Sequence, residues 1–266
     1  MLDKYNRRIN YLRISVTDRC NMRCRYCMPA EGVKLISHSE ILSFDEITSF
    51  ARTAVDLGVN KVRITGGEPL VRKGIEELVA MIAGIEGIKD LSMTTNGTML
   101  RKFAVPLAEA GMHRVNVSLD TLDPHKFMWL TRGGNVESTI DGIKAALEAG
   151  LTPVKINCVV KKSHDEPDAR AVKKLGERLG LEVRYIRQMD LARGEFGIVE
   201  GGDGGNCASC NRLRLTANGK VKPCLFNDLE YDVRELGAEG AIKKAIENKP
   251  PCGSYNMNGK FYNIGG

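Results

Sequence analysis

The sequence predicts an α/β fold: a partial (βα)6 TIM-like barrel followed by a small, cysteine-bearing C-terminal unit. Apolar, β-branched runs alternate six times with stretches of helical period, and this alternation is typical of a parallel sheet with right-handed crossovers. Six repeats are too few for the closed eight-stranded barrel, so we expect an open sheet with its functional face at the carboxyl ends of the strands. The alternation stops after Met189.

Each expected element follows from local hydrophobic periodicity. The expected strands are Tyr11–Val16, Lys61–Thr65, Ile88–Thr94, Arg114–Leu119, Val154–Val160 and Glu182–Ile186. The expected helices are Phe44–Leu57, Ile75–Ala83, Met99–Ala110, Val136–Ala149 and Pro167–Leu179. Ser43 and Glu46 form a capping box before the first helix. Glycines that favour left-handed C-caps end the helices, at Gly58, Gly84, Gly111, Gly150 and Gly180.

Two stretches interrupt this pattern. The residues around Pro124, Trp129 and Arg132 indicate a loop after the fourth strand. Residues 194–206 are rich in glycine and indicate a linker or mobile loop. The chain beyond them is too short for a large independent core, so we expect it to depend on the barrel and on a metal. We therefore divide the chain into residues 1–190 and 191–266, with a short helix near Val233–Glu247.

Composition excludes several classes of protein. The 266 residues are 42% hydrophobic and 27% charged, which is ordinary for a globular protein and unlike disordered or collagen-like chains. The formal net charge of +6 is spread along the chain, so it suits a solvated surface or a small anionic ligand better than nucleic acid. Neither a membrane-spanning run nor a secretory signal is apparent, and we expect a cytoplasmic protein without membrane contact.

Eight cysteines carry most of the functional information, because they cluster rather than scatter as disulfide scaffolds do. Cys20, Cys24 and Cys27 follow the first strand with the spacing C-x3-C-x2-C. Three thiolates on a four-iron cubane leave one iron open, and an open coordination position marks a reactive site. A structural zinc or iron–sulfur site with a distant fourth ligand is the alternative. Cys158 lies inside an expected strand and is interpreted as a small core residue.

Gly66, Gly67, Glu68 and Pro69 directly follow the second strand. Adjacent glycines allow close approach of a ligand to the backbone, and the carboxylate of Glu68 can accept hydrogen bonds from an ammonium group. Considered alone, this motif also fits a tight structural turn.

A second cysteine set lies near the C-terminus, with Cys207, Cys210 and Cys224 in the pattern C-x2-C-x13-C. The insert predicts a hairpin with an Asn-Gly turn at 218–219, which returns Cys224 to the other two cysteines. A zinc ribbon completed by Cys252 is the alternative.

The first cysteine motif together with Gly-Gly-Glu-Pro resembles the radical S-adenosylmethionine (SAM) enzymes. The resemblance implies a [4Fe–4S] cluster on Cys20, Cys24 and Cys27, whose open iron is chelated by SAM. Electron transfer then cleaves SAM to methionine and a 5′-deoxyadenosyl radical. The positions that match SAM-contacting residues are Tyr26, Gly66, Gly67, Glu68, Ser118 and Met189.

The second cysteine set and the terminal Ile264–Gly266 resemble the GTP 3′,8-cyclase family, lyases of the first step of molybdenum cofactor biosynthesis. The resemblance implies conversion of GTP to (8S)-3′,8-cyclo-7,8-dihydroguanosine 5′-triphosphate, with a second [4Fe–4S] cluster on Cys207, Cys210 and Cys224 in an auxiliary domain. The positions that match GTP-binding residues are Arg13, Arg63, Thr94, Lys155, Arg184, Arg212 and Arg214. Arg13, Gly265 and Gly266 match catalytic positions. An external electron donor of the reductase, flavodoxin or ferredoxin type is also implied, and a homodimer is compatible with it.

Three features depart from that family. Residues 190–207 form a shorter connection, Arg187 and Gln188 replace an acidic–aromatic pair, and Cys252 lies where no ligand is expected. A related radical SAM enzyme that acts on a peptide or another small molecule therefore remains an alternative. A metal-binding or electron-transfer module without catalytic activity is a third hypothesis.

Overall fold

The computed structural model describes residues 1–257 and 261–264. Its strands belong to one sheet, in the order β6-β5-β4-β3-β2-β1-β7-β8-β9. The strands are β1 (Tyr11–Ser15), β2 (Lys61–Thr65), β3 (Asp90–Thr95), β4 (Arg114–Ser118), β5 (Lys155–Val160), β6 (Glu182–Arg187), β7 (Arg212–Leu215), β8 (Lys220–Lys222) and β9 (Tyr231–Asp232). The helices are α1 (Phe44–Asp56), α2 (Ile75–Ala83), α3 (Leu100–Glu109), α4 (Pro124–Thr131), α5 (Val136–Glu148), α6 (Pro167–Leu179), α7 (Val233–Glu247) and α8 (Phe261–Ile264), with a 3-10 turn η1 at Pro69–Val71.

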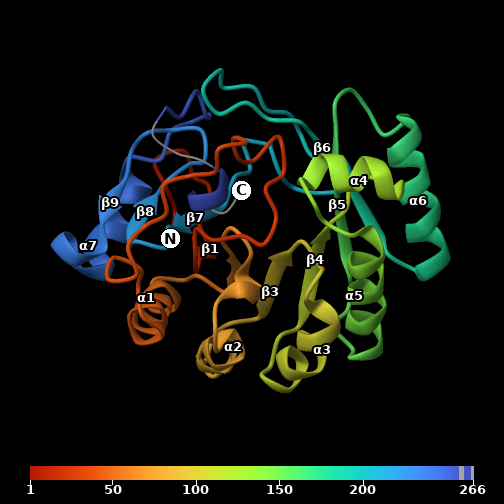
Figure 1. Ribbon diagram of the computed structural model, residues 1–266. Coiled ribbons are helices and arrows are strands. Elements are labelled where there is room, and N and C mark those ends of the chain that lie inside the picture. Colours follow the sequence, from red (N-terminus) through yellow and green to blue (C-terminus); the bar gives the residue numbers. More distant parts are fainter. Residues whose placement is uncertain (258–260, 265–266) are drawn as a thin grey trace.

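The first six strands run parallel, and α1, α2, α3, α5 and α6 cover the outer face of the curved sheet (Figure 1). The core lies between these layers, where Leu12, Ile64 and Leu78 are fully buried. Burial of each such side chain contributes about 1.5–3 kcal/mol. β6 and β9 remain at opposite ends of the sheet order, so the predicted open, partial barrel is confirmed. Within the described ranges no helix combines the length and the hydropathy that a membrane crossing requires.

The predicted helix boundaries are mostly confirmed. Ser43 Oγ accepts a hydrogen bond from the Glu46 amide, and Glu46 Oε2 accepts one from the Ser43 amide, so the capping box is present. The expected left-handed glycines follow α1, α3, α5 and α6, but the expectation is wrong for Gly84, whose φ is −73°. There the right-handed turn continues, and the left-handed residue is Gly87.

The expected loop after β4 is wrong, because this stretch contains helix α4. Asp123 caps the helix by accepting a hydrogen bond from the Lys126 amide at 3.0 Å, and Pro124 takes the first helical position. Both residue types favour helix starts at these places. The sequence therefore contained the start signal of α4, although the glycines that follow the helix favoured the interpretation as a loop.

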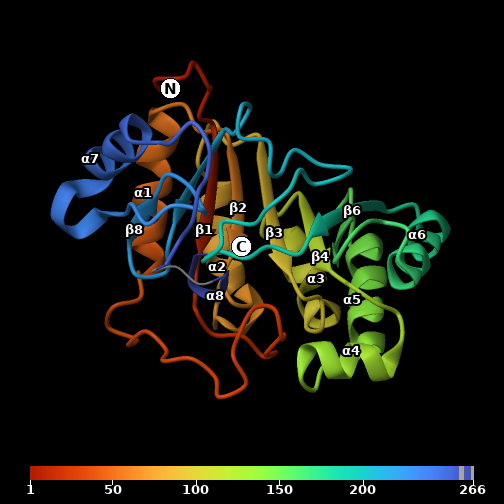
Figure 2. The ribbon, with the colours of Figure 1, turned by 90° about the horizontal axis from the view of Figure 1, so that it is seen from above.

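The C-terminal residues continue the sheet of the barrel. β7 lies parallel to β1, with Arg214 beside Arg13, and forms the predicted hairpin with β8. The predicted helix α7 packs against α1 and the β8–β9 edge, with a break in its helical backbone at Gly237. Leu225 and Ile264 belong to a small second core. Figure 2 shows the long connection between β1 and α1 extending beyond the sheet at the same end as α4.

The glycine-rich residues 194–206 pack beside β6 and line a cavity. Tyr185 and Glu200 exchange backbone hydrogen bonds, which attaches the segment to β6. A Cβ atom on Gly205 would lie 1.9 Å from the carbonyl oxygen of Gly197, so this fold of the chain requires glycine there. The segment forms a wall of a cavity rather than a simple spacer between two units.

Candidate active site

Two cavities adjoin: the first lies at the carboxyl ends of the strands, and the second extends to their amino ends, where Tyr11, Lys61, Asp90 and Arg114 begin β1 to β4. The expected placement at the carboxyl ends therefore holds for the first cavity only. The first, of about 200 Å³, contains the N-terminal cysteines and Gly66–Glu68 in its lining. The second, of about 220 Å³, is lined by arginines and the C-terminal cysteines. Asn157, Ile186 and Met189 line both. A molecule in one cavity can therefore approach a molecule in the other directly.

Cys20, Cys24 and Cys27 line the first cavity together. Burial raises the pKa of these thiols to about 11, 12 and 12 respectively, so their thiolates need a cationic centre as partner. Among the described residues no three Cys, His, Asp or Glu side chains converge on a single metal ion. A cubane binds each thiolate at a different iron, so its ligands stand further apart than those of one zinc ion. The residues present fit an iron–sulfur cluster.

The two glycines of the Gly-Gly-Glu-Pro motif pack against the strand-to-loop segment that leads to Cys20. Gly67 donates its amide to the carbonyl of Thr17 at 2.7 Å, and Glu68 donates its amide to the carbonyl of Arg19 at 2.8 Å. A Cβ atom on Gly67 would lie 2.3 Å from that Arg19 oxygen. The motif therefore also positions the cysteine loop.

The carboxylate of Glu68 is fully buried in the wall of the first cavity. It accepts hydrogen bonds from the hydroxyl of Thr95 at 2.8 Å and the amide of Asn96 at 2.7 Å, which connects the ends of β2 and β3. Burial raises the pKa of Glu68 to about 7, although these hydrogen bonds oppose the shift. The carboxyl group of Glu68 therefore titrates near neutral pH.

Tyr26 connects the cysteine loop to the opposite wall. Its hydroxyl donates to Asp120 Oδ2 at 2.8 Å, while Asp120 Oδ1 accepts the amide of Val159. Burial raises the pKa of Asp120 to about 6 and that of Tyr26 well above its usual value. Ser118 lies in the same lining. This arrangement holds the loop over the ends of β4 and β5.

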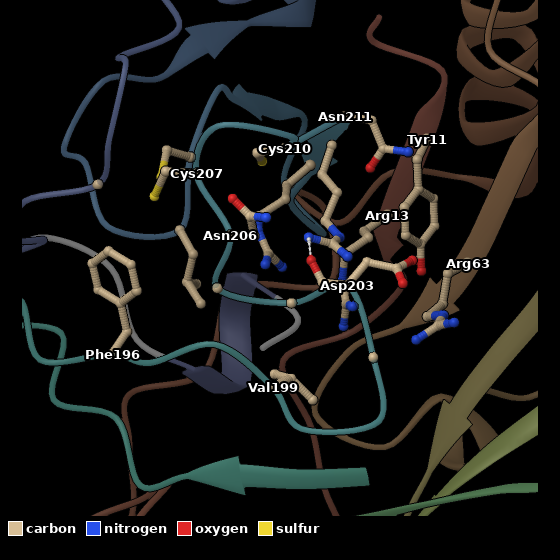
Figure 3. Close-up of a pocket in the computed structure, with 18 of the residues that line it drawn as sticks. Tyr11, Arg13, Arg63, Phe196, Val199, Asp203, Asn206, Cys207, Cys210 and Asn211 are labelled. Carbon is tan, nitrogen blue, oxygen red and sulfur yellow. Dashed lines mark hydrogen bonds between the residues drawn. The ribbon is translucent and has the colours of Figure 1, made fainter. Parts of the chain in front are cut away.

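Six arginines line the second cavity, and they come from five strands: Arg13, Arg63, Arg114, Arg184, Arg212 and Arg214. Arg114 was not among the expected site residues, and it forms an ion pair with Asp90 in the same lining. Figure 3 shows Arg13 and Arg63 beside Tyr11 on one side of the cavity and Cys207 and Cys210 on the other. Burial lowers the pKa of Arg13, Arg63 and Arg214 to about 10, so all three stay cationic at neutral pH. Buried like charges are costly alone, which favours a polyanion such as a polyphosphate.

The structure places the remaining residues that were expected to bind GTP in different locations. Arg184 lines the second cavity, and its Nε is buried without a hydrogen-bond partner among the described residues. Lys155 forms an ion pair with Glu182 and is absent from both linings. Thr94 lines the first cavity rather than the second. Gly265 and Gly266 lie outside the described residues.

Sequence reasoning missed some lining residues. Lys61 stands two positions before Arg63 on β2, and the period of two along a strand could have indicated it. Lys249 is 1% exposed and donates its ammonium group to the carbonyls of Arg212 and Pro223. No sequence signal indicates Lys249, because its partners are contributed by β7 and the segment after β8.

Cys207, Cys210 and Cys224 all line the second cavity. Burial alone would raise the pKa of Cys210, but the charge of Lys249 and a backbone hydrogen bond outweigh it, so this pKa is lowered. Cys252 Sγ lies 3.0 Å from Cys207 Sγ. The tertiary structure thus brings a fourth cysteine, Cys252, beside this set.

Comparisons with known proteins agree with the fold and the cysteine loop. The family model of the Radical SAM superfamily matches residues 14–175, and that of Molybdenum Cofactor Synthesis C matches residues 161–252. The structure of Streptococcus suis SuiB bound to S-adenosylmethionine is similar, with a TM-score of 0.64 and 17% identity over 92% of this chain and 66% of that chain. Native anSMEcpe with bound AdoMet has a TM-score of 0.63 and 16% identity over 90% of this chain and 81% of that chain. The chain belongs to the radical SAM superfamily, whose members use a [4Fe–4S] cluster and SAM.

Curated relatives narrow the assignment. A GTP 3′,8-cyclase of Thermodesulfovibrio yellowstonii is 41% identical over 92% of this chain and 91% of its own length. One of Pelotomaculum thermopropionicum is 42% identical over 94% of each chain. Within the superfamily, the chain belongs to the GTP 3′,8-cyclase family. These alignments span 292 and 305 positions, more than the 266 residues here, so the relatives carry segments that this chain lacks.

Proposed function

We propose that this chain converts GTP to (8S)-3′,8-cyclo-7,8-dihydroguanosine 5′-triphosphate as the first step of molybdenum cofactor biosynthesis. One observation carries the proposal: a cavity lined by six arginines adjoins the cavity of the C-x3-C-x2-C and Gly-Gly-Glu-Pro motifs. A polyanionic substrate and the radical source would thus be neighbours. The family relationship supports the same reaction.

The first cavity is the proposed SAM site. A [4Fe–4S] cluster on Cys20, Cys24 and Cys27, with SAM bound, supplies a 5′-deoxyadenosyl radical. The residues of this chain orient SAM: Gly66–Glu68 at its amino group, Ser118 and Met189 along its length, and Tyr26 beside its adenine. Tyr26 is itself hydrogen-bonded to Asp120, which positions its side chain in the wall.

The second cavity is the proposed GTP site. Arg63 and Arg184 bind the phosphates, since guanidinium groups form paired hydrogen bonds with phosphate oxygens. Arg13, Arg212 and Arg214 hold the remainder of the nucleotide, with Thr94 at the margin, whereas the ion pair with Glu182 keeps Lys155 out of the site. Asn157, Ile186 and Met189 line both cavities, where the ribose has to meet the radical. The hydrogen is removed from C3′, and the ribose radical then adds to C8 of guanine.

The C-terminal residues 191–266 are proposed to act as an auxiliary domain beside the barrel of residues 1–190. Cys207, Cys210 and Cys224 would hold a second [4Fe–4S] cluster facing the purine. Arg13 and the terminal Gly265 and Gly266 would complete the catalytic set. We place the protein in the cytoplasm, reduced by an external donor of the reductase, flavodoxin or ferredoxin type and able to form a homodimer.

The decisive experiment is anaerobic. Protein reconstituted with iron and sulfide is mixed with SAM, reductant and GTP, and 5′-deoxyadenosine and nucleotides are followed by mass spectrometry. Cys24→Ala should abolish both products, whereas Cys158→Ala, which alters a fully buried core cysteine outside both linings, should retain them. A GTP-derived cyclic nucleotide supports the proposal. 5′-Deoxyadenosine without a GTP product contradicts it and favours a peptide or another small molecule as substrate.

A further inference from the structure

Cys252 is held beside Cys207 by a buried cation. Arg7 Nη1 donates to the carbonyl of Cys207 at 2.9 Å and to that of Pro251 at 3.0 Å, while Nη2 donates to Pro250 at 2.7 Å. Asp3 accepts the Arg7 Nε hydrogen bond at 2.6 Å, and both side chains are almost fully buried. Arg7 therefore clamps together the two segments that carry these cysteines.

The two sulfur atoms are 3.0 Å apart, which is closer than two non-bonded sulfur atoms normally pack. A disulfide bond is about 2.05 Å long, so a small rotation of either side chain closes the gap. In a cubane each cysteine binds a different iron, and a sulfur this close to Cys207 has no iron of its own. Cys252 is exposed, and a small-molecule oxidant can reach it.

We propose that Cys207 and Cys252 form a reversible disulfide in the cluster-free protein, which withdraws one ligand from the second cysteine set until the bond is reduced. The pair itself does not depend on the proposed reaction. Its consequence for cluster assembly rests on the proposed function, because Cys207 is an iron ligand only in the proposed auxiliary cluster.

The oxidant is a small-molecule disulfide such as oxidised glutathione. The thiolate of Cys252 attacks one glutathione sulfur and expels the other as a thiolate, leaving a mixed disulfide. Cys207 then loses its proton and displaces the bound glutathione. Two cysteine thiols give up two electrons and two protons, and one glutathione disulfide becomes two glutathione molecules.

The test uses cluster-free, full-length protein, without SAM or GTP. The protein is equilibrated anaerobically with oxidised and reduced glutathione, the free thiols are alkylated, and disulfide-linked peptides are mapped by mass spectrometry. We expect one dominant link, Cys207–Cys252, that opens in reduced glutathione. Cys158→Ser should keep this link, and Cys252→Ser should lose it while its circular dichroism matches wild type. Links of Cys207 to Cys210 or Cys224 in equal yield would overturn the proposal.

A second measurement distinguishes whether Cys252 is a redox partner of Cys207 or a ligand of the second cluster. In a Cys20→Ala, Cys24→Ala, Cys27→Ala background, only the second set can hold a cluster. Adding Cys252→Ser should leave its iron content and electron paramagnetic resonance spectrum unchanged after reductive reconstitution. Loss of about half or more of that iron would make Cys252 a ligand and overturn the proposal. Neither readout uses GTP turnover, so a failure of the proposed GTP reaction is distinguishable from a failure of this proposal.

Discussion

Arg132 is hydrogen-bonded to Arg23: its Nη1 donates to the Arg23 carbonyl at 2.7 Å. The same Nη1 donates to the carbonyl of Met28 at 2.8 Å, so Arg132 spans the segment that carries Cys24 and Cys27. Arg132 follows α4 in a left-handed conformation, with φ at 55°. The helix that sequence patterning missed therefore supports the first cysteine motif.

Replacing Arg132 should loosen the first cluster. Arg132→Gly keeps the left-handed backbone accessible but removes both hydrogen bonds, each worth about 0.5–1.5 kcal/mol at a partly exposed position. We expect loss of iron to a chelator to become about fivefold to tenfold faster. Arg101→Ala, which removes only an exposed ion pair between α3 and α5, is the control and should leave the rate within about twofold. Equal rates in the two variants would contradict the role of Arg132.

GTP affinity should distinguish Arg184 from Lys155. Arg184→Ala removes a cavity-lining guanidinium, and one or two charge-assisted hydrogen bonds correspond to a dissociation constant about 10-fold to 100-fold higher. Lys155→Met removes the ammonium group of the ion pair, and the half-exposed Glu182 keeps its second ion-pair partner, Arg184. The dissociation constant of Lys155→Met should stay within about threefold of wild type. Titration calorimetry of cluster-loaded protein measures both, and equal losses would return Lys155 to the GTP site.

Glu68 should make the cluster-free protein less stable as pH rises. The folded pKa is about 7 against the usual 4.5, so the unfolded chain releases this proton at lower pH than the folded chain. The stability that Glu68 contributes below pH 4.5 is therefore lost as pH rises towards 7, by about 2 kcal/mol between about pH 5 and about pH 7. Urea unfolding of wild type and Glu68→Gln at both pH values measures this difference. Parallel pH profiles would show that Glu68 does not titrate in this window.

Gly67 should not tolerate even one added methyl group. Gly67→Ala places a Cβ against the Arg19 carbonyl, and such overpacking costs about 1–3 kcal/mol. The cysteine loop should shift, and iron incorporation should fall with the free energy of unfolding. Gly240→Ala, in α7 with its nearest neighbour at 3.6 Å, should instead stabilise the protein by about 0.5–1 kcal/mol. Thermal unfolding with iron analysis checks both, and a neutral Gly67→Ala would refute the packing argument.

Local patterns were sufficient for much of the fold and for the first part of the site. The strand and helix alternation predicted the parallel sheet, and the parallel rule placed Cys20 and Gly66 at its carboxyl ends. The Asn-Gly turn predicted the β7–β8 hairpin. The strand position of Arg63 predicted its place in a cavity. Each of these depends on residues close together in the chain, where periodicity and turn chemistry act directly.

Other features were decided by the tertiary structure alone. Arg214 stands beside Arg13 only because β7 pairs with β1, and Lys155 is withdrawn from the site by Glu182 on the neighbouring strand. Cys252 meets Cys207 through Arg7, which lies at the other end of the chain. Such contacts join distant segments, so they depend on which pairing gives the whole chain the lowest free energy. A local pattern of residues does not indicate which pairing of distant segments is the most stable.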